Sequence, residues 1–311
     1  MGWRRWGLVG LFVVAACSGG GDAAPSTTAG EPVAPGLTAV RTLAPSDGFA
    51  TPTFLSIDDD AGLVYVTDAE NGRVVGLALD GSASDVVLDD AGQPFQFEQH
   101  GPLGSVDTDG DGTLWIAESA RGRIVHLSPR AGEIGVLENH DGYERLLSAS
   151  VSPTGDRVYA VDDEGATVVV FDTADGSVVG TVGGTGRDPG ELFDTGSVEV
   201  LEDGSFWIAD AGNFRLQHLS ADGDVVQVIG PFDEGEPGSM AYPNDIAVDG
   251  DGRLWVADFQ GGGVTAFAAD GTPLGRFADE LRQPSSLAFD AAGLLYVTDW
   301  ATNQVHVFSV A

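Results

Sequence analysis

The sequence of 311 residues contains no lysine and a single cysteine. Its 14 basic residues are therefore all arginine, and with 48 aspartates and glutamates the formal charge is −34 at pH 7. A polyanion of this kind repels phosphate backbones and anionic lipid head groups, which argues against nucleic acid as a partner. With one cysteine, no disulfide can form within the chain.

The sequence also lacks an apolar run long enough to span a bilayer, which takes about 20 residues. The longest run, Leu8–Ala16, follows two arginines near the start of the chain. A short basic region before a short apolar run is typical of a signal peptide, and we predict one over residues 1–16.

Residues 14–17 read Val-Ala-Ala-Cys and resemble the lipobox of bacterial lipoproteins. The resemblance implies that Cys17 carries the lipid; the alternative is a chance cysteine at an ordinary cleavage site. Residues 17–36 are rich in Gly, Ala, Ser, Thr and Pro without apolar periodicity, which predicts a flexible tether. We therefore expect the protein in the cell envelope, on the outer face of the cytoplasmic membrane, with the lipid anchor as its only membrane contact.

Four short β-type runs separated by Asp-Gly and Gly-Gly turns are clearest at residues 243–277. The second run, Leu254–Asp258, has counterparts throughout the chain, each with Tyr or Trp followed three residues later by an acid. These acids recur every 41 to 50 residues, the spacing expected of propeller blades. They are Asp68, Glu118, Asp162, Asp210, Asp258 and Asp299. One acid per repeat at constant register predicts a structural role, in which the carboxylate accepts local backbone N–H bonds.

The repeats resemble the NHL family. The segments that match the family pattern are Pro243–Asp249, Leu254–Asp258 and the glycine-rich connector Val182–Phe193. The resemblance implies an all-β, six-bladed propeller over residues 37–311. It says little about activity, because propellers host enzymes, binders and scaffolds alike.

The last repeat stops one strand short of the others, since only three residues follow its third run, Val305–Phe308. An isolated strand-like segment, Thr38–Leu43, precedes the first repeat. We predict that this N-terminal strand completes the last blade and closes the ring, because closure removes the open sheet edges.

The segment 107–118 matches the spacing of a calcium-binding loop, with Asp107, Asp109 and Asp111 as its first carboxylates. The same segment falls where other repeats have a strand and a hairpin turn. A structural turn and a calcium site on that turn both stay open. Calcium is the only cofactor that the residues suggest.

An enzyme alternative follows from the resemblance to gluconolactonase-like propellers, which hold a divalent metal at the channel with a Glu, two Asn and an Asp. The equivalent positions here are Thr53, Pro102, Leu147, Gly196, Asn244 and Ser285. Only Asn244 could bind a metal, and widening the window by one residue adds Asp245 and three serines. A divalent site needs several converging oxygens.

The loops before the innermost strands combine aromatic residues with scarce arginines, the residue types enriched in binding hot spots. The candidate ligand-binding residues at this channel mouth are His100, Arg145, Arg187, Tyr242, Asn244, Asp245 and Arg282. A funnel lined by arginines favours a carboxylated or sugar-acid ligand.

Taken together, these residues predict a monomeric, lipid-anchored propeller that binds a protein or cell-envelope ligand as a non-catalytic binding or scaffold module. The alternative is a metal-dependent propeller enzyme of the lactonase or lyase type.

Overall fold

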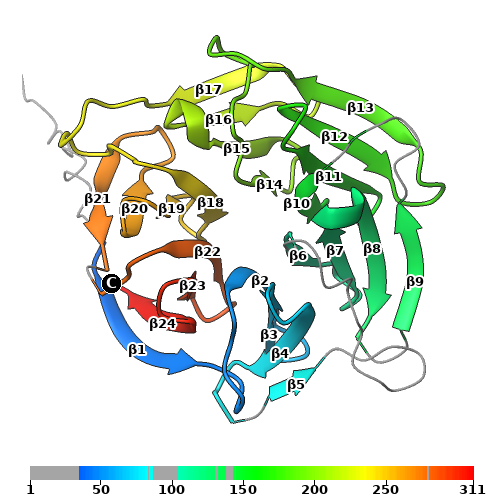
Figure 1. Cartoon of the computed structure of the whole chain (residues 1–311). Helices are drawn as coiled ribbons and strands as arrows, with labels where there is room; N and C mark the ends of the chain where they lie inside the picture. The colour runs from blue at the N-terminus through cyan, green and yellow to red at the C-terminus, as the bar shows by residue number, and fades with distance from the viewer. Residues whose placement is uncertain are drawn as a thin grey trace, which may run out of the picture. The chain divides into compact units, whose positions relative to one another are not determined.

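Six four-stranded antiparallel sheets are arranged as blades around a common axis in the computed structural model (Figure 1). The structure describes residues 35–82, 84–86, 104–129, 132–137, 143, 145–278 and 280–311. Residues 34–311 form one compact unit. The predicted all-β, six-bladed propeller is confirmed. Within the described residues, no helix is both long enough and apolar enough to cross a membrane.

Each blade runs from an innermost strand beside the axis to an outermost strand. Blade 1 comprises β2 (Pro52–Asp58), β3 (Leu63–Asp68), β4 (Arg73–Ala78) and β5 (Ser84–Val86). Blade 2 comprises β6 (Val106–Thr108), β7 (Leu114–Glu118), β8 (Arg123–Ser128) and β9 (Gly132–Leu137). Blade 3 comprises β10 (Leu146–Val151), β11 (Arg157–Asp162), β12 (Thr167–Asp172) and β13 (Val178–Gly183). Blade 4 comprises β14 (Val198–Val200), β15 (Phe206–Asp210), β16 (Arg215–Leu219) and β17 (Val225–Ile229). Blade 5 comprises β18 (Pro243–Val248), β19 (Leu254–Asp258), β20 (Gly263–Phe267) and β21 (Pro273–Phe277). Blade 6 comprises β22 (Pro284–Phe289), β23 (Leu294–Asp299), β24 (Gln304–Val310) and β1 (Leu37–Leu43).

The second strand of each blade is buried on both faces, because neighbouring blades cover it. In β19 every residue is buried, although the strand contains an aspartate. The turn before β19 is tight: the Gly252 amide donates to the Asp249 carbonyl over 2.9 Å, and Gly252 has φ +75°. Glycine adopts this left-handed conformation without steric cost, which explains the Asp-Gly signal in the sequence.

The ring is closed by its two ends, as predicted. β1 pairs antiparallel with β24, from Leu37 opposite Val310 to Leu43 opposite Val305. Leu43 is buried and packs with Phe49 and Val305 in the cluster between blades 1 and 6. Figure 1 shows β1 along the outer edge of blade 6, next to the C-terminus. The segment that begins the described chain thus supplies the outermost strand of its last blade.

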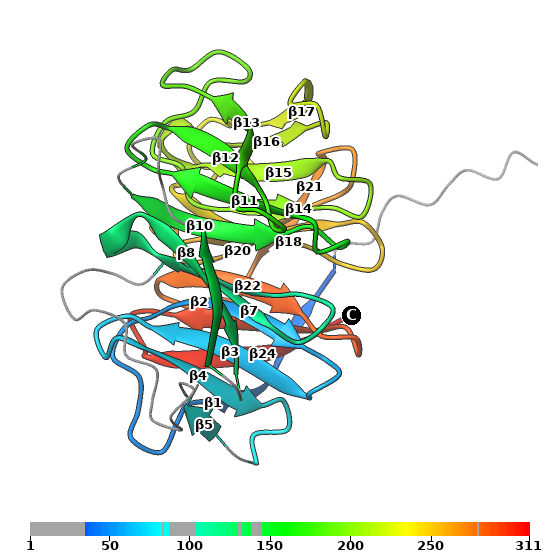
Figure 2. The same ribbon diagram turned by 90° about the vertical axis from the view of Figure 1, so that its right-hand side faces the viewer.

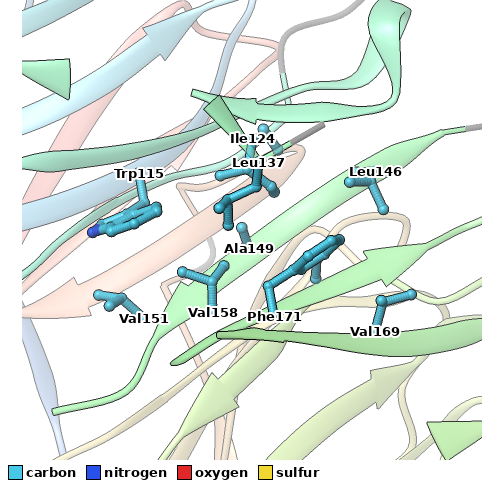
Figure 3. Packing of buried hydrophobic residues seen from close by; sticks show 11 residues of the cluster. Trp115, Ile124, Leu137, Leu146, Ala149, Val151, Val158, Val169 and Phe171 are labelled. Carbon is cyan, nitrogen blue, oxygen red and sulfur yellow. The ribbon is translucent and has the colours of Figure 1, made fainter. Parts of the chain in front are cut away.

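Apolar side chains fill the space between adjacent blades rather than one central core. Between blades 2 and 3, Trp115, Leu146 and Phe171 belong to one buried cluster (Figure 3). Burying a phenyl side chain such as that of Phe171, which is fully buried, contributes about 1.5–3 kcal/mol. Figure 2 views the ring from its side, so that successive blades are seen one above another. Each blade is stabilised by its neighbours, as the repeat architecture requires.

The recurring acids hold the loops that enter the innermost strands. Asp258, which is fully buried, accepts bonds from the Ala241 and Tyr242 amides and from the Arg276 guanidinium. Asp210 likewise accepts from the Phe193 amide over 2.9 Å. These bonds confirm the predicted structural role, because each carboxylate ties the end of a second strand to the loop that leads into its own blade.

Candidate functional site

The innermost strands β2, β6, β10, β14, β18 and β22 surround a cavity of about 290 Å³ on the axis of the ring. Its walls are polar where three carboxyl groups meet serine side chains. The carboxyl groups belong to Asp107 on β6, Glu199 on β14 and Asp245 on β18. At roughly 30 Å³ for each water, this volume would hold about ten water molecules or one small organic molecule. A polar cavity with several ionisable groups is the part of the described molecule best suited to chemistry.

Asp107 joins three blades through its hydrogen bonds. Its Oδ1 accepts from the Ser56 hydroxyl of blade 1 over 3.0 Å, and its Oδ2 accepts from the Val151 amide of blade 3 over 2.8 Å. Burial nevertheless outweighs these donors and raises the pKa of Asp107 to about 6. The carboxyl group therefore titrates close to neutral pH.

Asp245 has a similar bridging role in blade 5, two residues nearer the start of its strand than the register of Asp107. Its Oδ2 accepts from the Ser286 hydroxyl over 2.5 Å and from the Leu287 amide over 3.0 Å, both in blade 6. Burial raises the pKa of Asp245 as well. The sequence placed Asp245 at the channel mouth as a ligand-binding residue, and the structure shows it bridging blades 5 and 6 inside the channel.

Glu199 differs from both aspartates, because no hydrogen bond reaches its carboxyl group from the described residues. Burial raises the pKa of Glu199 well above its usual value, and the charges of Asp107 and Asp245 raise it further. The side chain is only half-buried, so its carboxyl group meets the cavity. These causes favour the protonated form of Glu199 beside the two aspartates.

Glu199 was not among the residues predicted from the sequence. A sequence signal for Glu199 was present. Glu199 is the residue of its innermost strand that lies opposite the recurring aromatic, Trp207, where blade 5 has Ala247 opposite Trp255. Opposite the recurring aromatic, the other innermost strands have Ser, Ala or Asp. A glutamate between Val198 and Val200 is the longest acidic side chain at this register, and only the ring geometry shows that the register faces a cavity.

These three pKa shifts predict how stability depends on pH. Because the folded state keeps protons that the unfolded chain releases, the free energy of unfolding should fall as pH rises from about 4 through 6 and above. A pKa of about 6 in place of 3.8 makes the Asp107 contribution at most about 3 kcal/mol. Urea unfolding at pH 5 and pH 8 measures the loss, and we expect a smaller loss in Glu199→Gln. An equal loss in the variant would contradict the assignment.

The predicted mouth residues are only partly brought together. Arg145 Nη2 forms an ion pair with Asp163 Oδ2 at 2.8 Å. Burial and the charge of Asp194 raise the pKa of the Tyr242 phenol, so this side chain remains a neutral donor. The Asn244 amide donates to the Ser285 carbonyl over 2.5 Å.

The remaining mouth candidates contribute less to a common site. Arg187 and Arg282 are exposed, and the Arg187 carbonyl accepts from the Arg215 guanidinium in the loop after β13. The Arg282 amide donates to Asp299. His100 and Cys17 lie outside the described residues.

The calcium-loop carboxylates point in different directions. Asp107 faces the channel, whereas Asp109 Oδ2 accepts from the Thr113 hydroxyl and the Trp115 indole, and Asp111 is exposed. Within the described residues, no three His, Cys, Asp or Glu side chains are grouped so that they could hold a metal ion. The segment forms the hairpin turn into β7, in which the Asp111 amide donates to Asp109.

Two clusters of hydroxyl, imidazole and carboxylate lie on blades 2 and 4. In blade 2 the Thr113 hydroxyl donates to Asp109 and lies 2.7 Å from His126 Nε2, and the His126 ring stacks on Trp115. Because the hydroxyl gives its proton to the carboxylate, the imidazole is the donor and cannot activate the hydroxyl as a nucleophile. Blade 4 repeats the arrangement with Ser205 and His218, so we assign both clusters to structure.

The hairpin register also decides whether the lactonase-type metal ligands are present. The Gly104 amide donates to the Ala117 carbonyl in blade 2, and the Gly196 amide makes the equivalent bond to Ala209 in blade 4. Gly104, and not Pro102 as predicted from the sequence, is therefore the blade 2 residue equivalent to Gly196. This position therefore supplies glycine in two blades, and Asn244 has its amide bonded to Ser285. The described residues do not fit the metal-ligand set of those propellers.

The comparisons with known proteins agree with this fold and add an enzyme. The profile described as "NHL repeat" matches residues 49–77 and 281–308. The chain carries NHL repeats. It is also 27% identical over 246 residues to the pentonolactonase XacC of Haloferax volcanii, across 78% of this chain and 75% of that protein.

Solved structures of low identity share the propeller fold. Virginiamycin B lyase from Staphylococcus aureus has a TM-score of 0.63 at 15% identity, covering 89% of this chain and 88% of that one. A protein of unknown function from Bacteroides thetaiotaomicron has a TM-score of 0.66 at 15% identity, covering 89% and 76%.

The expectation of a non-catalytic binding or scaffold module is contradicted by the relation to XacC, an enzyme that aligns with most of the propeller. The expectation was wrong because an active site need not have a metal-ligand set at the mouth, and carboxyl groups lie deeper in the channel.

Proposed function

We propose that this propeller is an enzyme of the lactonase or lyase type, and that its reaction is the hydrolysis of a small lactone. The observation that carries the proposal is the alignment with a pentonolactonase over three quarters of both chains. The channel is consistent with it, because a polar cavity of about 290 Å³ has room for a five-carbon lactone beside three carboxyl groups.

We assign the proton transfers to Glu199. Asp107 and Asp245 are held by donors from neighbouring blades, whereas the Glu199 carboxyl group faces the cavity without such a partner among the described residues. The two aspartates act through Glu199, because their charges add to the effect of burial and favour a proton on it. Pairs of carboxyl groups whose pKa values are pushed apart are the usual basis for acid and base roles.

In this reaction water adds to the lactone carbonyl carbon and the bond from that carbon to the ring oxygen breaks. The ring oxygen takes the proton of Glu199 and becomes a hydroxyl group, and the attacking water gives its proton back to the glutamate. The product is an open-chain hydroxy acid, and Glu199 is protonated again. A positioned acid of this kind typically contributes 10²- to 10⁴-fold to the rate.

The test is hydrolysis of pentono-1,4-lactones by the purified protein, followed by acid release in a weakly buffered indicator solution. We expect turnover that survives dialysis against EDTA, because the described residues do not provide a metal-ligand set. No turnover with any pentonolactone would refute the function. Turnover that disappears with EDTA and returns with a divalent ion would refute the assignment to Glu199 alone.

We further propose that the enzyme is lipid-anchored through Cys17 on the outer face of the cytoplasmic membrane. The support is the sequence at residues 1–17, a basic region, a short apolar run and Val-Ala-Ala-Cys. In a bacterial host, Cys17→Ser should move the protein from the detergent-extracted membrane fraction to the soluble fraction. An unchanged distribution would remove the anchor and leave the fold and the reaction untouched.

A further inference from the structure

The loops at the mouth of the channel share one backbone pattern across the ring. In blades 1, 3, 5 and 6, the amide of the residue directly after the recurring acid donates to a backbone carbonyl in the loop that enters the innermost strand. In blade 5 that carbonyl belongs to Tyr242, two residues before Asn244, and the other three blades use the equivalent residue. The four bonds are Ala69 to Thr51, Asp163 to Arg145, Phe259 to Tyr242 and Trp300 to Gln283, at 3.0–3.2 Å except for 2.9 Å in blade 5. Blade 4 has the close variant Gly212 to Asp194. The architecture therefore needs these backbone groups and leaves the side chains free to differ.

The side chains at these positions differ between blades, with aromatic residues in blades 5 and 6 and charged residues in blades 3 and 4. Blades 5 and 6 supply Tyr242, Phe259 and Trp300, whose rings form a continuous row with centroid separations of 6.3 and 5.1 Å. Trp300 is 43% exposed, an unusual exposure for so large an apolar side chain. We call these three residues the aromatic row. Repeat structure alone does not require three adjacent aromatic rings on one side of a mouth.

The opposite side of the same mouth is charged. Arg145 and Asp163 form their ion pair in blade 3, and Asp194 follows in blade 4 with φ +51°, an uncommon conformation for a residue other than glycine. Tyr242 lies between the two sides, and its phenol, whose pKa burial raises, is close enough to Asp194 for that charge to raise the pKa further. We call Arg145, Asp163 and Asp194 the charged arc. It contains two carboxylates and one guanidinium.

We infer that the aromatic row and the charged arc form a substrate-selecting mouth that takes a neutral, polyhydroxylated ring such as a sugar lactone. This inference rests on the proposed lactone hydrolysis. The apolar face of such a ring fits against aromatic side chains, while its hydroxyl groups can donate to Asp163 and Asp194. The arc has two carboxylates and one guanidinium, and Arg145 is the more exposed member of its ion pair with Asp163.

The same charges discriminate between substrate and product. Hydrolysis converts a neutral ring into an open-chain anion, which loses the flat face and gains a carboxylate. Both changes weaken its binding to this mouth, since the open chain no longer fits flat against the row and the whole chain carries a formal charge of −34. The mouth thus favours entry of the lactone and departure of the acid.

Kinetics of the full chain test the row. We expect Trp300→Ala and Phe259→Ala each to raise KM for a pentono-1,4-lactone about tenfold with kcat within about twofold, because binding lost equally in the ground and transition states appears in KM. The matched control is Phe214→Ala, which removes a phenyl side chain that is 48% exposed outside the row. An unchanged KM in both row variants, or an equal rise in the control, would overturn the inference.

A binding measurement separates this inference from the proposed reaction. By calorimetry we expect a neutral pentose ring to bind at least tenfold more tightly than the corresponding open-chain pentonate, with the difference reduced at high salt. If no lactone is hydrolysed but the pentose binds and Trp300→Ala abolishes its binding, the mouth stands and the reaction falls. If lactones are hydrolysed but pentose and pentonate bind equally, the mouth falls and the reaction stands.

Discussion

Replacing Glu199 with glutamine should lower kcat for lactone hydrolysis by about 10²- to 10⁴-fold while the protein stays folded. The amide has the shape of the protonated acid but cannot give up or regain a proton in the reaction. It is also neutral, like the protonated acid that burial and the charges of Asp107 and Asp245 favour in the wild type. The variant should therefore melt at or above the wild-type temperature, and stopped-time acid release measures the lost activity.

The matched control is Glu202→Gln, which removes an exposed carboxyl group three residues along the same segment. It should keep the wild-type rate. The pH profile gives a second readout, because the wild-type rate should fall as pH rises through the elevated pKa of Glu199 and its proton is lost. Full activity in Glu199→Gln, or a rate that climbs steadily through this pH range, would exclude Glu199 as the proton donor.

Deleting residues 37–43 should open the ring and abolish cooperative folding. The deletion removes the pairing of β1 with β24 and the buried Leu43 side chain, which together contribute about 5 kcal/mol or more. That loss is comparable with the whole stability of a typical domain. It also exposes the edge of β24, and unpaired edges promote aggregation. Thermal melting by circular dichroism, together with light scattering, measures both effects.

Val40→Ala is the control for this deletion, because Val40 lies on the same strand but is 47% exposed. Its free energy of unfolding should change by less than about 0.5 kcal/mol. A deleted protein that melts within a few degrees of the full chain would mean that blade 6 is stable with three strands, and that ring closure contributes little.

The fold followed from local signals. Asp-Gly turns, the recurring aromatic of the second strands and acids such as Asp258 repeat at blade spacing, and each reflects an interaction within a single blade or with its entry loop. The missing last strand and the unassigned segment at Thr38–Leu43 then left one way to close the ring, and the pairing of β1 with β24 follows it. Repetition makes such predictions secure, because every blade tests the same rule.

The candidate site did not follow in this way. The mouth residues Arg145 and Tyr242 were predicted from their loops, but the grouping of Glu199 with Asp107 and Asp245 joins residues of three different blades.

The sequence by itself determined that the chain forms a ring of six blades, because each blade is specified by turns and hydrogen bonds between residues that are close in the sequence. Only the tertiary structure decided which side chains share the axis. Whether a residue such as Glu199 meets a cavity, and which charges surround it there, depends on strands brought together when the ring closes. The spacing of residues within one repeat does not predict which residues of different blades come close together. The position of Glu199 and the two sides of the mouth therefore became visible only in the complete ring.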